Sequence, residues 1–527
     1  MTNRSRLAAA GVVASGAGVA VSQALTVWLN IASTPIQAVA QAIIVLTPGN
    51  VAETLIGIVG RNDKPLLVTG VTIAVLLLGA LAGVLCRRGR WAGNAVVLAV
   101  TGLGAAAVVT GQGAVAADLL PVVVGGLVWY GAQGYLVGYL ERRAAVRPAP
   151  IAAQPARAEA QPTRPATPVV PAEEGSTRRG FLLRAGAVAL AGAVVGLGST
   201  FLGRGRAAVE ASRKMLRLPA TGGLVPKGAQ VDVPGMPTWQ TPDDTFYRID
   251  TALVVPSVDP QQWRLRIHGM VDHPIELSYH DLLQRQITQA WVTICCVSNP
   301  VGGPLIGNAW WSGVRVADLL KEAGVHPGAD AVRQTSQDGW TCGTPIQALT
   351  DGRNAMLAVA MNGQPLPFEH GFPVRMIVPG LYGYVSATKW VTDLEVTTFD
   401  KFAAYWTVRG WSATGPVKTE SRVDVPRSGA SVNAGAVRVG GSAWAQHTGI
   451  AKVEYRLDGQ PWQTAELGTV PDVDTWVQWA GTVQAASGDH TITVRATDRS
   501  GYTQTAVRHG VVPDGATGWD SVSFTAG

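Results

Sequence analysis

The chain has 527 residues, of which 47% are hydrophobic and only 15% are charged, with a net charge of +6. This composition is too apolar for an ordinary soluble protein and indicates a membrane part joined to globular domains. The arginines cluster beside apolar segments rather than on a basic amphipathic helix, which argues against a nucleic-acid binder, and four cysteines are too few for a disulfide-stapled scaffold.

The first part of the chain contains apolar segments of about 20 residues, the length that crosses a bilayer as a helix. They lie at residues 6–29, 65–86, 91–110 and 118–140. A further apolar segment at residues 36–59 is interrupted by Pro48, Gly49 and Glu53, which favours an interfacial or re-entrant segment over a full crossing. We therefore predict a membrane domain at residues 1–143 with about four spans.

Residues 144–178 are rich in proline and alanine and have no hydrophobic period, which predicts an extended linker. A fifth apolar segment follows at residues 179–204. It starts at the pair Arg178-Arg179, whose surroundings (Ser-Thr-Arg-Arg-Gly-Phe-Leu) resemble the twin-arginine export signal, here inside the chain. The alternative is that both arginines only anchor the span on its cytoplasmic side.

Basic residues predict the orientation of the chain in the membrane. Arg4, Arg6, the group at residues 87–90 and Arg142 fall on one side if the four spans alternate, and positive charge marks the cytoplasmic side. The linker then lies in the cytoplasm, and everything after residue 204 lies outside. We expect a multi-pass protein of the cell membrane with extracytoplasmic globular domains.

From residue 219 onward, short strand-like alternations and brief helical patterns predict an α+β domain, which we place at residues 205–400. After about residue 402 the helical patterns nearly vanish and strand–turn patterns repeat. Asp458-Gly459 is a hairpin signal in this region. The strand spacing predicts a β-sandwich of immunoglobulin type at residues 401–527. The predicted fold is thus multi-domain, with about five membrane spans, an α+β domain and a sandwich.

Three motifs in the α+β region stand out. They are Thr-Ile-Cys-Cys-Val-Ser-Asn at residues 293–299, His-Gly-Phe-Pro-Val-Arg at residues 370–375, and Lys389-Trp390. Together they resemble the molybdenum–pterin core of the sulfite oxidase family. The resemblance covers the chain from about residue 219 to its end. It implies that the sandwich corresponds to the family's dimerisation domain, so that a homodimer can form.

The resemblance implies a molybdenum cofactor, Mo-molybdopterin, with Cys296 as the metal ligand. A soft thiolate on a sharply turning segment suits a thiophilic transition metal. Neighbouring strand residues point to opposite faces, so only one of Cys295 and Cys296 can face the metal. Taken alone, a cysteine in an apolar strand is most often an inert small hydrophobic residue, but the companion motifs favour the metal ligand.

Further cofactor-binding residues follow from the same resemblance. His370 and Arg375 are implied to bind the pterin and its phosphate, which suits the fork of a guanidinium group. Asn299 closes the cysteine motif and is carried over as a cofactor-binding residue. The alternatives are a structural ion pair for Arg375 and a satisfied core histidine for His370.

Two more segments are assigned by the resemblance. The loop that contains Ala387, Thr388 and Lys389 is implied to hold the pterin. Arg248, in the sequence Phe-Tyr-Arg, is implied to approach the cofactor and the substrate, although Ile249-Asp250 follows it where the family often has Asn-His. The alternative for Arg248 is a surface ion pair.

Two departures from the family bear on the substrate. Sulfite oxidases carry two arginines after the asparagine of the cysteine motif, where this chain has Pro300 and Val301. Their catalytic tyrosine falls on Trp411, and an indole cannot donate a phenolic proton. We therefore predict that Trp411 stands at the catalytic position and that sulfite is oxidised poorly or not at all, unless Arg409 or Arg422 completes the pocket.

Two functions of different classes remain. The first is a membrane-anchored molybdopterin-dependent oxidoreductase that transfers an oxygen atom and two electrons to or from a small sulfur- or nitrogen-containing compound. The second is a non-catalytic adhesion or assembly module that retains the cofactor fold. Metal and pterin content of the purified protein would separate them.

The residue types that the membrane part lacks indicate where the electrons can go. All eight histidines lie at or after His268, and residues 2–204 contain no methionine. Haem therefore cannot be ligated by histidine or methionine within the predicted spans. We expect an external electron carrier, either a quinone system or a cytochrome.

Overall fold

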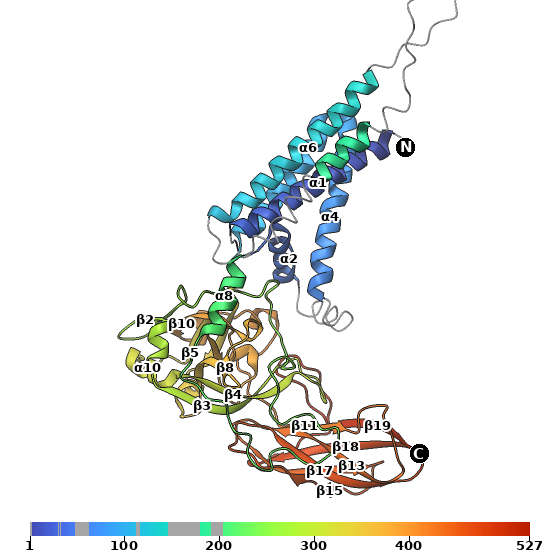
Figure 1. Ribbon diagram of the computed structural model, residues 1–527. Coiled ribbons are helices and arrows are strands. Elements are labelled where there is room, and N and C mark those ends of the chain that lie inside the picture. The colour runs from blue at the N-terminus through green and yellow to red at the C-terminus, as the bar shows by residue number, and fades with distance from the viewer. Residues whose placement is uncertain are drawn as a thin grey trace, which may run out of the picture. The chain divides into compact units, whose positions relative to one another are not determined.

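The computed structural model describes residues 3–29, 31, 33–47, 63–111, 116–145, 180–190 and 204–527. The chain divides into two compact units (Figure 1). We call Met1–Ala207 the helical unit and Ala208–Gly527 the globular unit.

The helical unit contains long apolar helices. Its α-helices are α1 (Asn3–Trp28), α2 (Pro35–Leu46), α4 (Asp63–Leu85), α5 (Arg90–Val109) and α6 (Leu120–Ala145). Four stretches are long and apolar enough to cross a membrane: Arg4–Trp28, Lys64–Arg88, Arg90–Val109 and Ala116–Arg142. They coincide with the four segments predicted as spans, so the prediction of four apolar helices of membrane-crossing length is confirmed.

The other membrane predictions are covered only in part. α2 has 12 residues, which is too short to cross a bilayer, and the predicted segment beyond Thr47 lies outside the described residues. The fifth apolar segment is described as a helix only at Gly180–Leu190. The rest of it, the arginine pair and most of the linker also lie outside the described residues, so these assignments stay predictions.

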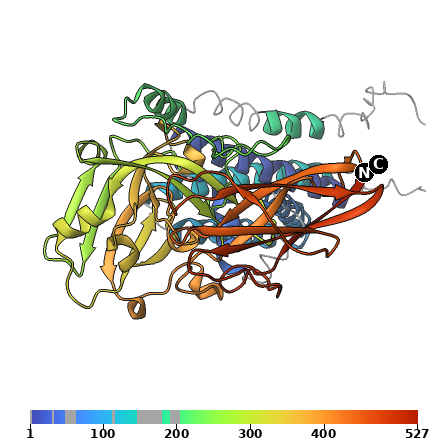
Figure 2. The same cartoon turned by 90° about the horizontal axis from the view of Figure 1, so that it is seen from below.

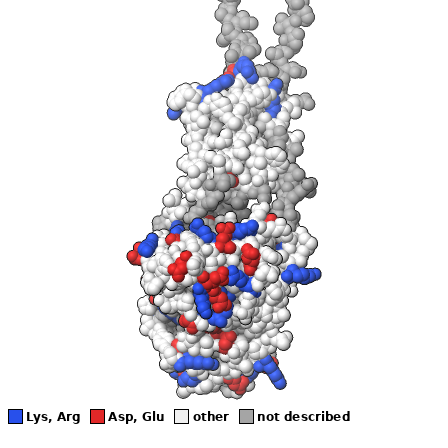
Figure 3. Space-filling view, turned by 90° about the vertical axis from the view of Figure 1, so that its left-hand side faces the viewer, with Lys and Arg blue, Asp and Glu red and all other residues white. Residues whose placement is uncertain are grey.

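Small residues let the helices of the helical unit approach closely. A Cβ atom added to Gly11 of α1 would lie 1.9 Å from the backbone oxygen of Gly79 in α4, and one added to Gly83 would lie 2.1 Å from that of Leu7. Such backbone contacts are typical of helices that associate within a membrane. On the face that Figure 3 shows, the middle of this unit is nearly free of charged side chains.

The α+β part of the globular unit is built on two sheets. The first has the order β2-β1-β10-β5-β6, and the second has the order β3-β4-β7-β8 with β9 paired to β7. The first sheet consists of β1 (Arg264–Gly269), β2 (Ile275–Ser278), β5 (Ala331–Ser336), β6 (Thr341–Pro345) and β10 (Val391–Thr397). The second consists of β3 (Ile287–Cys295), β4 (Ile306–Arg315), β7 (Met356–Met361), β8 (Gln364–Pro365) and β9 (Arg375–Ile377).

Helices accompany these sheets. They are α8 (Arg204–Met215), which leads into the globular unit, α9 (Tyr279–Leu283), α10 (Val316–Ala323) and α11 (Gln347–Thr350). The central strand β7 is buried along its whole length, as expected for a continuous apolar run inside a sheet. β3 and β4 pair from Ile287 opposite Val314 to Cys295 opposite Ile306. This pairing brings the cysteine motif to the end of the sheet.

The C-terminal part is the predicted sandwich of two sheets. One sheet contains β11 (Glu420–Val425), β13 (Gly435–Trp444), β16 (Glu466–Leu467) and β17 (Val477–Ala485). The other contains β12 (Ser431–Val432), β14 (Ile450–Leu457), β15 (Gln463–Thr464), β18 (Gly488–Asp498) and β19 (Asp520–Ala526). Figure 2 shows the long strands of the sandwich in orange and red. Asp458 and Gly459 have φ angles of 47° and 72° after β14, in the hairpin turn that the sequence predicts.

The α+β part and the sandwich share one hydrophobic core. Trp444 and Trp476 of the sandwich are buried in the same cluster as Trp291 and Cys295 of the α+β part. Trp239 Nε1 also donates to the backbone oxygen of Trp476 at 3.3 Å. Because each part buries side chains of the other, residues of the sandwich can support the region around the cysteine motif.

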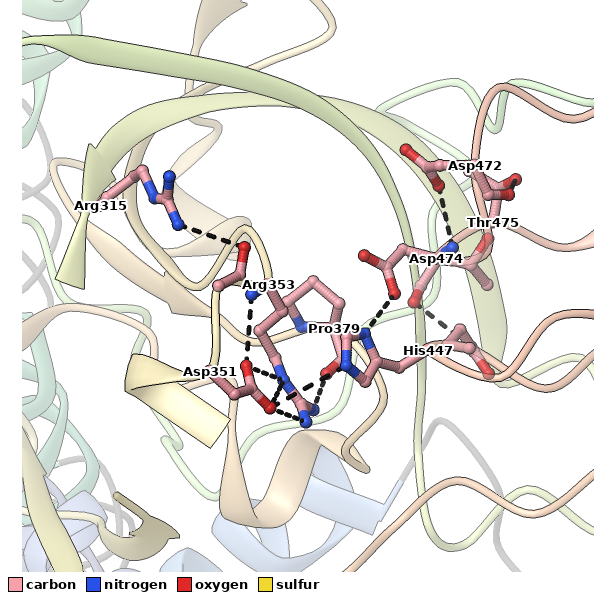
Figure 4. A network of polar contacts seen from close by, with 11 residues as sticks. Arg315, Asp351, Arg353, Pro379, His447, Asp472, Asp474 and Thr475 are labelled. Carbon is pink, nitrogen blue, oxygen red and sulfur yellow. Dashed lines mark hydrogen bonds and ion pairs between the residues drawn. The ribbon is translucent and has the colours of Figure 1, made fainter. Parts of the chain in front are cut away.

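A network of polar contacts also crosses the boundary between the α+β part and the sandwich (Figure 4). His447 of the sandwich lies with Nδ1 3.3 Å from Asp474 and Nε2 3.9 Å from Asp351 of the α+β part. Asp351 also pairs with Arg353 at 2.6 Å, and Arg353 donates to the backbone oxygen of Pro379 at 2.7 Å. These contacts tie the sandwich to the segment that follows β9.

Candidate active site

A cavity opens in the globular unit beside the end of β3 and encloses about 850 Å³, including space open to solvent. Five separate stretches of the chain contribute to its lining, at residues 246–251, 294–298, 336–340, 370–390 and 406–411. Two of these stretches, residues 294–298 and 370–390, contain the three motifs that the sequence singled out. The fold therefore brings the cysteine motif, the His–Arg motif and the lysine together.

The two adjacent cysteines face different surroundings. Cys295 is fully buried in the hydrophobic core, whereas Cys296 lines the cavity. Burial raises the pKa of the Cys296 thiol, so a bound cation must replace the proton to form a thiolate. The described residues contain no group of three or more His, Cys, Asp or Glu side chains that could hold a metal ion. A metal on Cys296 therefore needs further ligands from a cofactor.

Asn299 stabilises the turn that follows the cysteine motif, between β3 and β4. Its Oδ1 accepts a hydrogen bond from the backbone of Leu305 at 2.7 Å, its side chain is buried, and it is not among the residues that line the cavity. The structure thus gives the Asn299 side-chain oxygen a role in closing the turn between β3 and β4, and the cofactor contact predicted from the sequence stays a prediction. A buried amide inside a turn bonds most readily to the turn's own backbone.

A residue of the sandwich, Arg422, also contacts this turn. Arg422 donates from Nη1 to the backbone oxygen of Gly303 at 3.1 Å and pairs with Asp424 at 2.8 Å. Arg409 lies 3.8 Å from the ring centre of Tyr405. Neither arginine is among the cavity-lining residues, so neither rebuilds the anion pocket in the described structure.

Arg375 is a buried cation at the base of the cavity. It is 4% exposed, and burial lowers its pKa to about 10. Its guanidinium donates only to backbone oxygens, those of His370 at 3.3 Å, Ala387 at 3.4 Å and Met376 at 3.5 Å. Among the described residues no carboxylate forms an ion pair with it, so they do not provide the structural ion pair considered as the alternative. A buried guanidinium without a carboxylate is costly unless an anion binds there.

His370 is a buried neutral imidazole next to Arg375. Burial is the main cause that lowers its pKa to about 3, with Arg375 and Lys389 adding to the effect. Nε2 lies 3.1 Å from the backbone oxygen of Asp243, and since a carbonyl only accepts, this nitrogen carries the proton. Nδ1 is therefore left as an acceptor at a residue that lines the cavity.

Lys389 also lines the cavity and is 10% exposed. Its Nζ lies 2.7 Å from Asp250 and 3.1 Å from the backbone oxygen of Glu369. Burial lowers its pKa to about 8. Arg248 pairs with the same carboxylate at 2.8 Å, but its own side chain is 36% exposed and is not among the lining residues. Arg248 thus stands beside the cavity, held by Asp250.

The rest of the predicted pterin loop is placed by short-range contacts. Ala387 lines the cavity and donates its backbone N–H to Gly383 at 3.0 Å. Thr388 is fully buried, and its Oγ1 lies 3.2 Å from Cys342 Sγ. Thr388 therefore anchors the loop to the interior of the domain, while Ala387 and Lys389 face the cavity.

Aromatic side chains form the remaining lining. Trp411, predicted at the catalytic position, is 5% exposed and lines the cavity. Its ring centre lies 5.9 Å from that of Tyr384 and 6.2 Å from that of Trp406. Trp340 and Tyr247 line the cavity as well. Such a surface suits the apolar part of a small molecule.

Sequence reasoning missed several lining residues. They are Tyr247, Asp250, Ser298, Asp338, Trp340, Tyr384 and Trp406. Tyr247, Asp250 and Ser298 lie within two residues of positions that were assigned, so their neighbours marked the right segments. Asp338 and Trp340 lie in the turn between β5 and β6, where an Asp-Gly pair signals only a turn.

The lining fits a molybdopterin cofactor. It combines a soft sulfur ligand in Cys296 with a buried, unpaired guanidinium in Arg375 that suits a phosphate dianion. The neutral Nδ1 of His370 and the carboxylate of Asp338 can accept hydrogen bonds from the N–H groups of a pterin.

Comparisons with known proteins agree with this fit. The family described as "Oxidoreductase molybdopterin binding domain" matches residues 252–406, and "Bacterial Ig domain" matches residues 421–494. The chain is 33% identical over 193 residues to the uncharacterized oxidoreductase YuiH of Bacillus subtilis, covering 37% of this chain and 88% of that protein. Over 271 residues it is 28% identical to mitochondrial sulfite oxidase of Homo sapiens, covering 43% of this chain and 49% of that protein.

The chain thus spans about half the length of that sulfite oxidase. Among solved structures, the sulfane dehydrogenase SoxCD of Paracoccus pantotrophus matches at 23% identity with a TM-score of 0.44, over 55% of this chain and 82% of that chain. The match to YuiH covers most of that protein, and the matched molybdopterin domain contains Cys296, His370, Arg375 and Lys389. The chain belongs to the sulfite oxidase family of molybdopterin-dependent oxidoreductases.

Proposed function

We propose that this protein is a membrane-anchored oxidoreductase that exchanges an oxygen atom and two electrons with a small sulfur- or nitrogen-containing substrate. In balanced form, the substrate and water yield the oxidised substrate, two protons and two electrons, or the reverse. The observation that carries the proposal is the cavity in which the Cys296 thiol and the unpaired Arg375 lie together. A non-catalytic module would have no use for a buried guanidinium without a carboxylate partner.

When bound, the molybdenum cofactor supplies the oxygen-atom transfer and holds the two electrons. Cys296 would hold the metal, and the buried guanidinium of Arg375 would hold the phosphate. His370 donates its Nε2–H to Asp243, which keeps Nδ1 available to orient the pterin. Lys389 is a further donor, positioned by Asp250 and Glu369. Together these residues hold the reacting centre rigidly against the substrate space.

The aromatic residues exclude water from that space. Trp411 and Tyr384 pack against each other, and the Tyr384 hydroxyl donates to the backbone oxygen of Ser412 at 2.8 Å. Burial raises the pKa of Tyr384 to about 12, so it stays a neutral donor over the physiological range. With an indole at residue 411 and no arginine at residues 300 and 301, sulfite is a poor fit.

Steady-state kinetics of cofactor-loaded protein test the substrate proposal. Sulfite, dimethyl sulfoxide and trimethylamine N-oxide would be compared with artificial electron donors and acceptors. We expect turnover of a sulfur or nitrogen compound and little turnover of sulfite. A sulfite KM in the low micromolar range would contradict the proposal, and so would purified protein that contains neither molybdenum nor pterin.

The cellular placement is part of the proposal. The distribution of arginines puts the linker inside and the globular unit outside the cytoplasm, and electrons pass to or from an external quinone system or cytochrome. Protease added to intact spheroplasts should cut after residue 204 and spare the linker. Protection of the globular unit from the protease would refute this orientation.

A further inference from the structure

One carboxylate joins two cationic side chains beside the cavity. Asp250 Oδ2 lies 2.7 Å from Lys389 Nζ and 2.8 Å from Arg248 Nε, and its other oxygen lies 3.4 Å from Arg248 Nη2. The Asp250 side chain is only 5% exposed. At this distance and burial, the single negative charge of Asp250 offsets part of the positive potential of the two cations, most strongly at the buried Lys389.

The charges of the lining leave little room for an anionic substrate. The charged side chains that line the described cavity are Asp250, Asp338, Arg375 and Lys389. Arg375 is the group assigned to the cofactor phosphate, and Lys389 is paired with Asp250. Asp338 adds no positive charge. Within the described lining, no cation is left to bind an oxyanion substrate.

The apolar part of the lining also favours a substrate that is not an anion. Trp411 lies between Tyr384 and Trp406, with ring centres 5.9 and 6.2 Å away. Aromatic faces attract apolar groups and cations, and they repel anions. A substrate that combines a sulfur or nitrogen atom with methyl or larger organic groups therefore matches the surface better than a small dianion does.

We propose that Asp250 is a specificity-determining residue, which pairs with Lys389 and Arg248 and lowers the positive potential that they present to the cavity, and so makes the site take uncharged or cationic sulfur or nitrogen compounds in preference to oxyanions. The inference rests on the proposed function, because it concerns the substrate of the same site. It also gives a reason for the Ile249-Asp250 pair in this chain. The histidine that the family often has at the second position would carry no fixed negative charge.

The test uses the full-length, cofactor-loaded protein and sulfate, an oxyanion whose sulfur cannot be oxidised further. Asp250→Asn removes the charge and keeps the shape of the side chain. We expect calorimetric titration to show sulfate binding about tenfold or more tighter in this variant, since charge-assisted hydrogen bonds to the released cations become available. Asp250→His should act in the same direction.

Asp393→Asn is the matched control. Asp393 also bridges two basic side chains, Arg266 at 3.1 Å and His268 at 3.0 Å, but it is not among the cavity-lining residues. Its replacement should leave sulfate binding unchanged. An equal gain in this control would overturn the proposal, because the effect would then be one of overall charge.

Three further results would overturn it. These are unchanged sulfate affinity in both Asp250 variants, low-micromolar sulfate binding by the unaltered protein, and loss of the pterin from both variants, which would make Asp250 a cofactor-binding residue. Sulfate binding needs no turnover. A protein that binds sulfate as expected but converts no sulfur or nitrogen compound would contradict the proposed function and leave the charge selection standing.

Discussion

Two groups of residues line the cavity and differ in origin and chemistry. The polar lining comes from a single stretch and consists of His370, Arg375 and Lys389. The aromatic lining comes from three stretches and consists of Trp340, Tyr384, Trp406 and Trp411. The polar lining is nearly fully buried and bonds mostly to backbone atoms, while in the aromatic lining Trp411 contacts both Tyr384 and Trp406.

The difference teaches why one group carries a motif and the other does not. A phosphate and a pterin require donors and acceptors at fixed positions, so their binding residues must keep type and spacing. An apolar surface requires only area and shape, which many aromatic combinations supply. The motifs that resemble the family therefore contain the polar lining, whereas the aromatic lining and Asp250 lie outside those motifs.

The largest expected effect concerns the metal ligand between the two linings. Cys296→Ser should leave the fold intact but abolish metal-centred activity, because a neutral hydroxyl cannot replace the thiolate. Even changes to residues behind a ligand often cost ten- to a hundredfold, so the loss should exceed about a hundredfold. Cys295→Ser should be much milder, since Cys295 packs in the core. Molybdenum content and activity measure both, and molybdenum lost only from the Cys295 variant would reverse the assignment.

The second prediction uses the neutral histidine of the polar lining. The pKa of His370 is about 3 in the folded state against 6.5 for an ordinary histidine, so the unfolded chain binds the proton first as the pH falls. The contribution to stability is complete above pH 6.5 and declines toward pH 3, by about 3 kcal/mol between pH 6.5 and 4. His370→Gln should remove this part of the acid destabilisation.

Unfolding of the cofactor-free, full-length protein at pH 7 and pH 4 measures it. The difference in stability between the two pH values should be smaller in the His370→Gln variant than in the unaltered protein. Equal losses in both proteins would show that the imidazole is not held neutral by its surroundings.

The third prediction tests whether Arg375 binds an anion or only supports the fold. Arg375→Met should lower pterin affinity by about tenfold or more for each charge-assisted bond lost. The same change should raise the thermal stability of the cofactor-free protein, because it removes a buried cation without a carboxylate partner. Pterin content and the unfolding midpoint should thus move in opposite directions. A decrease in both would identify Arg375 as a structural residue.

The smallest effect belongs to the aromatic lining. Trp406→Ala should raise the KM for an organic sulfur or nitrogen oxide about three- to tenfold, since one aromatic contact contributes about 0.5–1.5 kcal/mol. Pterin content should stay constant. Trp462→Ala is the control, because Trp462 packs against Arg456 and Arg495 of the sandwich and does not line the cavity. A loss of pterin in the Trp406 variant would remove the distinction between the two linings.

Much of the fold follows from local patterns. The four apolar helices were predictable because membrane-crossing length is a property of a continuous stretch. The Asp458-Gly459 hairpin was predictable because two adjacent residues with positive φ define the turn. Choosing Cys296 over Cys295 needed the family motif and the alternation of a strand, and the cavity contains Cys296 as expected.

By itself, the sequence determined the apolar helices, the sandwich and the cofactor, since these depend on short-range patterns and a specific motif. It also singled out six of the residues that line the cavity, which are Cys296, His370, Arg375, Ala387, Lys389 and Trp411. Only the tertiary structure decided that Asn299 closes a turn, that Arg422 holds that turn from the sandwich, and that Asp250 pairs with Lys389, 139 positions away. The reason is physical. A side chain's partner is set by which segments pack together, and spacing along the chain carries no information about a contact between distant segments.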